Sequence, residues 1–164
     1  MKCPSGAKEC IQDCTSRGCN ANSNAETLTQ FCIWGKCKVA CSGSAKQCNQ
    51  TCVHGECNST CEAENCRQDC LSGDCDLQCP SGTKECTQEC SGGRCRMTCS
   101  SKVAKCEQDY FGGGCDLKCF AKECKVSCFG GGCTRSSPST GAVRAGFGII
   151  NFLLWAFAAV GSFL

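Results

Sequence analysis

A cysteine repeat runs through most of this chain and limits what it can fold into. One copy, CTQECSGGRCRMTC at 86–99, has two Cys-x3-Cys segments separated by four residues with a glycine near the end. A connector of four or six residues leads to the next copy, so the period is 18 or 20 residues. The segments CPSGAKEC at Cys3 and CPSGTKEC at Cys79 differ at one position, which indicates tandem duplication. A fixed period of this length predicts a repeat architecture.

Composition narrows the class of protein further. The chain has 25 cysteines in 164 residues, which is typical of a disulfide scaffold in an oxidising compartment. Apolar side chains are sparse before residue 140, so cross-links are expected to replace a conventional core. The formal charge of +2 comes from interspersed acidic and basic residues without a basic stripe, which argues against a nucleic-acid partner.

Each copy predicts two short strands joined by a turn. The centre of the second Cys-x3-Cys segment is mostly apolar and its neighbours are polar, which is the alternation of a half-buried strand. Glycine in the intervening four residues suits a hairpin loop. We therefore predict a small disulfide-rich all-β repeat protein in which short β-hairpins stack in a solenoid or a meander. The alternative is a series of short disulfide-linked helical turns, because cysteines at i and i+4 also share a helix face.

Glutamine occupies the centre of the first Cys-x3-Cys segment in six copies. These residues are Gln12, Gln30, Gln50, Gln68, Gln88 and Gln108, and Val126 ends the series. In a solenoid they could form an interior amide ladder. The interpretation we favour from sequence is that glutamine merely tolerates a half-buried face lined by cysteine.

Damaged copies of the repeat suggest the disulfide pattern. Ser23 and Leu28 replace two cysteines that flank one connector, so those two cysteines would have been partners. Extended to every connector, this rule gives Cys3–Cys10, Cys41–Cys48, Cys61–Cys66, Cys79–Cys86, Cys99–Cys106 and Cys119–Cys124. The turns would be closed by Cys14–Cys19, Cys32–Cys37, Cys52–Cys57, Cys70–Cys75, Cys90–Cys95 and Cys128–Cys133. Only Cys115, opposite Tyr110, stays unpaired. The rival rule, in which the two outer cysteines of a copy pair with each other and the two inner cysteines likewise, leaves five cysteines without a partner.

The motifs of metal and catalytic sites are missing from the sequence. No two cysteines are adjacent or separated by one or two residues, so the usual chelating pairs of zinc sites are absent. The single histidine, His54, lies in a glycine turn without a nucleophile or acid pattern around it. We therefore expect neither an enzyme nor a bound cofactor or metal.

Two sequons indicate passage through the secretory route. Asn49 and Asn58 each begin an Asn-x-Thr sequence within one copy. In the hairpin interpretation both side chains project away from the cysteine face, next to each other. We predict both as N-glycosylation sites of a glycoprotein.

The composition changes abruptly after Cys133. Residues 1–133 form the repeat region, with about seven copies of which the first is truncated; 134–148 are a Ser/Gly-rich linker, and 149–164 are a hydrophobic tail. Small residues, a short spacer and a terminal apolar tail are the order of a GPI-attachment signal, with Ser139 as the expected attachment site. The alternative is a C-terminal transmembrane tail, although about sixteen apolar residues are few for a full span.

The beginning of the chain is the middle of a repeat. Met1 stands two residues before Cys3, as Met97 stands before Cys99, and residues 1–20 contain no apolar segment of a signal peptide. We expect the natural protein to be longer, with a signal peptide and further copies upstream.

Three functions fit these patterns. The first is a GPI-anchored structural or adhesive protein of the cell surface or extracellular matrix, with self-association or matrix and carbohydrate contacts. The second is a recognition module that binds a protein or carbohydrate through variable turn residues such as Trp34 and His54. The third is a thiol protein that buffers metal.

Overall fold

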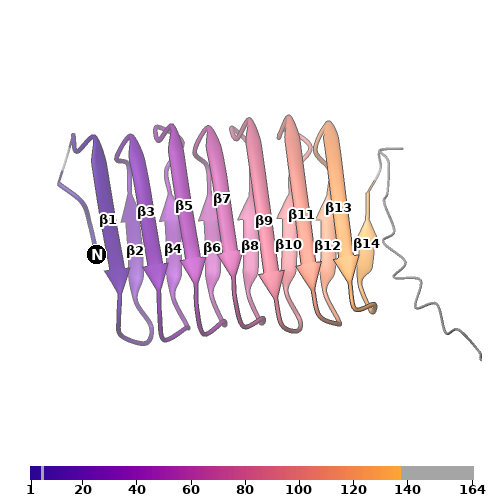
Figure 1. Ribbon diagram of the computed structural model, residues 1–164. Helices are drawn as coiled ribbons and strands as arrows, with labels where there is room; N and C mark the ends of the chain where they lie inside the picture. The colour runs from indigo at the N-terminus through magenta and orange to yellow at the C-terminus, as the bar shows by residue number, and fades with distance from the viewer. Residues whose placement is uncertain (5, 138–164) are drawn as a thin grey trace, which may run out of the picture.

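The computed structural model describes residues 1–4 and 6–137, and the elements in these ranges are all β-strands (Figure 1). The odd-numbered strands are longer and come from the glutamine-containing segments: β1 (Glu9–Cys14), β3 (Thr27–Cys32), β5 (Gln47–Cys52), β7 (Asn65–Cys70), β9 (Glu85–Ser91), β11 (Lys105–Phe111) and β13 (Glu123–Phe129). The even-numbered strands come from the second segments: β2 (Asn20–Ser23), β4 (Lys38–Cys41), β6 (Asn58–Cys61), β8 (Asp76–Cys79), β10 (Arg96–Cys99), β12 (Asp116–Cys119) and β14 (Thr134–Ser136).

These strands form a two-sheet β-solenoid. One seven-stranded sheet contains only the odd strands and the other only the even strands, and neighbouring strands in each sheet pair in parallel. Figure 1 shows the odd sheet in front and the even sheet behind it, with turns at the lower edge and connectors at the upper edge. We call one long strand, its turn and the following short strand a coil.

The predicted hairpins are therefore wrong, although the strand–turn–strand order is right. Consecutive strands such as β5 and β6 belong to opposite sheets and face each other across the interior, while each strand pairs with its equivalent in the neighbouring coil. The meander is wrong for the same reason, and the helical alternative is wrong because the cysteine segments form strands, whereas the predicted all-β solenoid is confirmed. A four-residue glycine turn reverses the chain equally well within one sheet and between two, so turn chemistry alone could not distinguish them.

Register between coils keeps equivalent residues in line. Between β5 and β7 the partners are Cys48 with Cys66, Gln50 with Gln68, and Cys52 with Cys70. The two connector lengths leave this register intact, because the extra residues of the longer connectors lie outside the strands. Side chains of one type therefore form columns that run along the solenoid.

The interior is filled by cysteine, glutamine and small or medium apolar residues. The even sheet contributes Val39, Leu77, Met97 and Leu117, all at most 3% exposed. The connectors add a further column, because residues at one connector position are buried in six of the seven connectors: Ala25, Ala45, Ala63, Thr83, Val103 and Ala121. Sulfur and amide groups thus replace much of the hydrocarbon of an ordinary core.

The six glutamines form an amide ladder, so the interpretation favoured from sequence is wrong. In each step the Nε2 of one glutamine donates to the Oε1 of the glutamine before it, at 2.7–2.9 Å from Gln30–Gln12 to Gln108–Gln88. Parallel pairing in register creates the ladder, since it places identical amides one above another. Two atoms at the ladder ends, Gln12 Nε2 and Gln108 Oε1, are buried without a hydrogen-bond partner.

The glycine turns require close approach between coils as well as positive φ. Gly55 has φ +72°, and a Cβ built there would lie 2.2 Å from the backbone oxygen of Gly73 in the next coil. The residue after the glycine is also left-handed in some coils, although it is not glycine. These residues are Lys36, Glu56, Asp74 and Arg94, with φ of 57°, 52°, 56° and 57°.

Candidate functional site

Twelve disulfides cross-link the chain, six across connectors and six across turns. They join the same pairs of cysteines that the damaged copies suggested. Each bond closes a loop with a sequence separation of 5 or 7. The turn bonds lie within one coil, whereas the connector bonds join the short strand of one coil to the long strand of the next, in addition to the strand pairing and the glutamine ladder.

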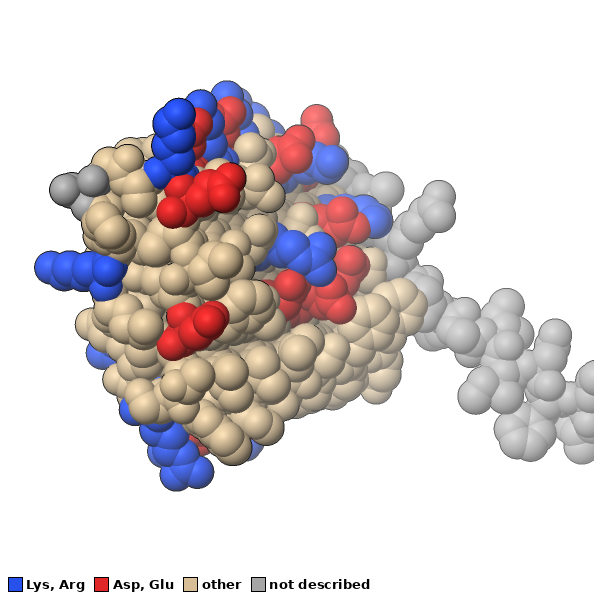
Figure 2. Space-filling model, turned by 60° about the vertical axis from the view of Figure 1, so that its left-hand side comes forward, with Lys and Arg blue, Asp and Glu red and all other residues tan. Residues whose placement is uncertain are grey.

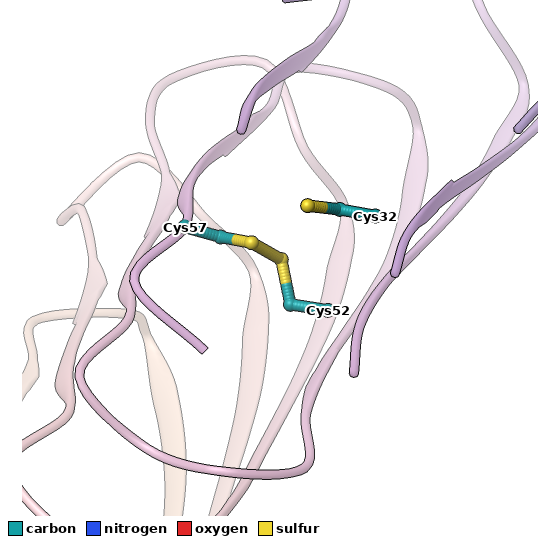
Figure 3. A group of neighbouring side chains, drawn as sticks. All are labelled: Cys32, Cys52 and Cys57. Carbon is teal, nitrogen blue, oxygen red and sulfur yellow. A yellow bond between two sulfur atoms is a disulfide. The ribbon is translucent and has the colours of Figure 1, made fainter. Parts of the chain in front are cut away.

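Stacking brings sulfur atoms of different coils together. Cys32 lies beside the Cys52–Cys57 disulfide, and the three Sγ atoms are within 4.8 Å of one another (Figure 3). The other such groups are Cys41, Cys48 and Cys61; Cys70, Cys90 and Cys95; and Cys79, Cys86 and Cys99. All these sulfurs are in disulfides, which lack the thiolate that metals bind. Sequence spacing did not reveal these groups, because their members come from different coils.

Cys115 is the one free cysteine among the described residues, and it is buried. The backbone N–H of Cys95 donates to its Sγ at 3.1 Å, and burial raises the pKa of the thiol. Tyr110 occupies the position of the missing partner, is fully buried, and donates its hydroxyl to the Gly92 carbonyl. Burial, followed by the neighbouring Cys115, raises the pKa of Tyr110 to about 12. A buried thiol with a raised pKa is a poor nucleophile, so Cys115 does not have the environment of a reactive cysteine.

The second damaged position is repaired by packing. Leu28 is fully buried in place of one cysteine, and Ser23 is 8% exposed in place of the other. The Ser23 hydroxyl accepts a hydrogen bond from the Ala25 N–H at 3.2 Å. The connector keeps its path without a disulfide.

The two sequon asparagines face outward but are not neighbours. Asn49 is in β5 and Asn58 is in β6, so they lie in opposite sheets. Asn58 is exposed and Asn49 is half-buried. Their expected side-by-side placement depended on hairpin pairing and is wrong for that reason, whereas their use as glycosylation sites stays a prediction.

Charged side chains lie in rows that follow the coils. At the connector edge, uppermost in Figure 2, Glu26 pairs with Lys46 and Glu64 with Lys84. The hydrogen bond and charge of Lys46 lower the pKa of Glu26. These pairs are exposed, so each adds little to the free energy of unfolding. Their opposite charges lie on neighbouring coils and therefore attract one coil to the next.

The turn edge carries exposed aromatic and apolar residues. Trp34 and His54 stack with ring centroids 5.2 Å apart, and Phe111 stacks on Phe129 at 5.0 Å. Leu71, at the same turn position as the two phenylalanines, is half exposed. Stacking rather than burial keeps these rings in line, because each coil presents the same turn position to solvent.

Two neighbouring hollows lie beside this edge. One, of about 370 Å³, is lined by Arg17, Trp34, Lys36, His54 and Glu56. The other, of about 480 Å³, shares Lys36 and Glu56 and runs past the starts of β4, β6, β8 and β10. We call the two together the turn groove.

Ser139, the linker from residue 138 and the tail at 149–164 lie outside the described residues. Within the described part of the chain, no helix has the length and apolar character needed to cross a membrane. The GPI signal and the alternative transmembrane tail therefore stay predictions from the sequence.

No protein-family model, curated protein or solved structure matches the chain. The function must therefore be argued from the chain itself. Its most distinctive surface is the turn groove, and its most distinctive construction is the column of disulfide-clamped coils.

Proposed function

We propose that this chain is the repeat region of a GPI-anchored extracellular structural or adhesive protein. The observation that carries the proposal is the twelve-disulfide solenoid, in which short-range bonds clamp six turns and six connectors and two parallel sheets join the coils. Such a rod resists unfolding and proteolysis locally, since opening one coil leaves the clamps of its neighbours intact. Disulfides in this number fit an extracellular location.

Attachment by lipid follows from the C-terminal sequence pattern. A rod fixed at one end would hold its repeats away from the membrane, which suits a coat, spacer or adhesive protein. The sequons Asn49 and Asn58 are outward-facing in this arrangement and agree with the same compartment.

Enzymatic release tests the anchor. The chain is expressed in animal cells behind a signal peptide, and the cells are treated with phosphatidylinositol-specific phospholipase C. The proposal predicts release into the medium, whereas a transmembrane tail would keep the protein on the cells. Replacing both Ser139 and Gly141 with leucine should reduce surface display, with Ser100→Leu as a control outside the signal.

A recognition role is the second candidate, and one observation favours it. Trp34 is 55% exposed in a hollow that also contains charged side chains, which is an unusual position for the largest apolar residue type. Metal buffering by thiols would need reduction of the disulfides first. Titration of thiols in the native, oxidised protein separates it from the other two roles.

A further inference from the structure

Trp34 is 55% exposed, and His54 stacks on one face of its indole ring with an interplanar angle of 15°. In the coil before Trp34 the equivalent turn residue is Ser16, which is too small to cover the indole, and the equivalent residue after His54 is Ser72. The Trp34–His54 pair is therefore a short aromatic platform with a free end.

The platform lies in a hollow large enough for a sugar ring. Its 370 Å³ falls in the range of small-ligand sites, and aromatic surface with a few polar groups is the usual lining of such sites. The larger part of the turn groove shares Lys36 and Glu56 with this hollow and reaches two further coils. Parallel strands are about 4.8 Å apart, close to the length of one pyranose unit in an extended oligosaccharide.

Charges in the turn groove are of both signs and mostly compensated. Asp74 pairs with Arg94 at 3.0 Å and Asp76 with Arg96 at 3.3 Å. These exposed pairs offer both donors and acceptors to hydroxyl groups.

Arg17 and Lys38 are the cations of the groove that make no ion pair with any residue of the described ranges, whereas Lys36 has a carboxylate partner, Glu56, at 3.6 Å. Of the two, only Arg17 lines the hollow that contains Trp34. A guanidinium binds carboxylate or sulfate through paired hydrogen bonds. Its position beside the platform places a cation at the rim of a stacked ring.

We propose that the turn groove binds an acidic oligosaccharide, with one ring stacked on the free face of Trp34 and its carboxylate or sulfate bound by Arg17. A pyranose has a face of C–H groups, whose positive hydrogens suit the negative face of an indole, and a rim of hydroxyls that suits the mixed charges. The inference deepens the adhesive role proposed above and rests on it for the extracellular setting. Binding by purified protein can be measured whether or not the anchor exists.

The test uses the full chain with Trp155→Phe, which leaves Trp34 as the only tryptophan. Three probes are titrated by calorimetry and tryptophan fluorescence: a galacturonate trisaccharide, a sulfated heparin tetrasaccharide and neutral cellotriose. We expect saturable binding of at least one acidic probe, about tenfold tighter than cellotriose, which is the usual size of one charge-assisted contact. The two acidic probes distinguish carboxylate from sulfate.

Variants separate the stacked ring from the charge. Trp34→Ser, which copies Ser16 and Ser72, should abolish binding in calorimetry without unfolding the protein. Arg17→Gln should weaken the acidic probe about tenfold and leave cellotriose unchanged. Phe129→Ser, at an exposed ring far along the solenoid, is the matched control and should bind like the parent.

Several outcomes would overturn the proposal. They are no binding of any probe by the folded protein, unchanged binding by Trp34→Ser, and equal affinity for acidic and neutral probes. Tighter binding of a single-stranded thymidine oligonucleotide than of both acidic probes would also overturn it. None of these results bears on phospholipase release, so failure here is distinguishable from failure of the anchored role.

Discussion

The glutamine ladder makes a sharp prediction, because the chain contains both an interior step and an end step. Gln68 Nε2 donates to Gln50 Oε1 at 2.9 Å and to the Ser59 carbonyl at 2.9 Å, while its Oε1 accepts from Gln88 Nε2 at 2.9 Å. Valine already fills the equivalent position at Val126, so it suits the space. Gln68→Val and Gln108→Val are therefore comparable in shape and different in hydrogen bonding.

Gln68→Val interrupts the ladder on both sides. Gln88 Nε2 keeps the Thr98 carbonyl at 3.4 Å and a weak contact with Cys79 Sγ at 3.9 Å, and Gln50 Oε1 keeps only the Ser59 hydroxyl at 2.6 Å. A buried polar group left short of partners costs about 1–3 kcal/mol, so two such groups should lower the free energy of unfolding by about 3 kcal/mol.

Gln108→Val removes only the end of the ladder. Gln108 Oε1 already lacks a partner, and in the variant Gln88 Oε1 takes its place as the unpartnered atom. The other loss is a contact of Gln108 Nε2 to the Lys118 carbonyl at 3.5 Å. The expected cost is about 1 kcal/mol or less.

Guanidinium unfolding followed by circular dichroism, with disulfides intact, measures both variants. The account predicts a difference of about 2 kcal/mol between them at similar m-values. The double variant Gln50→Val/Gln68→Val should cost less than the sum of its single variants, since neighbouring amides share the interrupted bonds. Equal costs for Gln68→Val and Gln108→Val would refute the ladder as a stabilising element.

Three further measurements follow from the turns and from the damaged coil. Gly55→Ala should destabilise the protein by at least about 2 kcal/mol more than Gly18→Ala. Both glycines have a similar positive φ, but only a Cβ at position 55 would meet a backbone oxygen of the neighbouring coil. Similar costs would show that the coils are not in close contact. Tyr110, the only tyrosine, should ionise near pH 12 in a spectrophotometric titration of the folded protein. Its contribution to the free energy of unfolding is complete below pH 10 and is lost as the pH rises through about 12. Ionisation near pH 10 in the folded protein would contradict its burial. A thiol reagent should label Cys115 only after unfolding and then find one thiol per chain; rapid labelling of native protein would place Cys115 at the surface.

Much of the fold follows from the sequence because the repeat encodes it locally. Alternation between cysteines defines the strands, and glycine defines the turns. The paired loss at Ser23 and Leu28 indicates which cysteines are close, because a cysteine without its partner can no longer form the disulfide.

The sheet arrangement does not follow from the same signals. A disulfide such as Cys52–Cys57, with its Cα atoms 6.4 Å apart, spans either a hairpin or a turn between two sheets. The choice depends on contacts between coils 18 or 20 residues apart, which no single copy contains. The glutamine ladder, the sulfur groups and the placement of Asn49 and Asn58 all depend on that choice, so the errors share one physical origin.

The turn groove was only partly foreseeable. Sequence analysis singled out Trp34 and His54 as variable turn residues, but it could not show that they stack or that Arg17 and Glu56 border the same hollow. Those relations also require the parallel register, which converts positions in different copies into neighbours on one surface.

Disulfide mapping of the unreduced protein can show whether separate bonds clamp the connectors and the turns. After unfolding in denaturant with the disulfides intact, trypsin should release residues 97–102, which contain Cys99, joined to 106–118 through the Cys99–Cys106 bond. If each copy instead closed on itself by a Cys86–Cys99 bond, residues 97–102 would be joined to 85–94. The first product agrees with the clamped solenoid, and the second would contradict it.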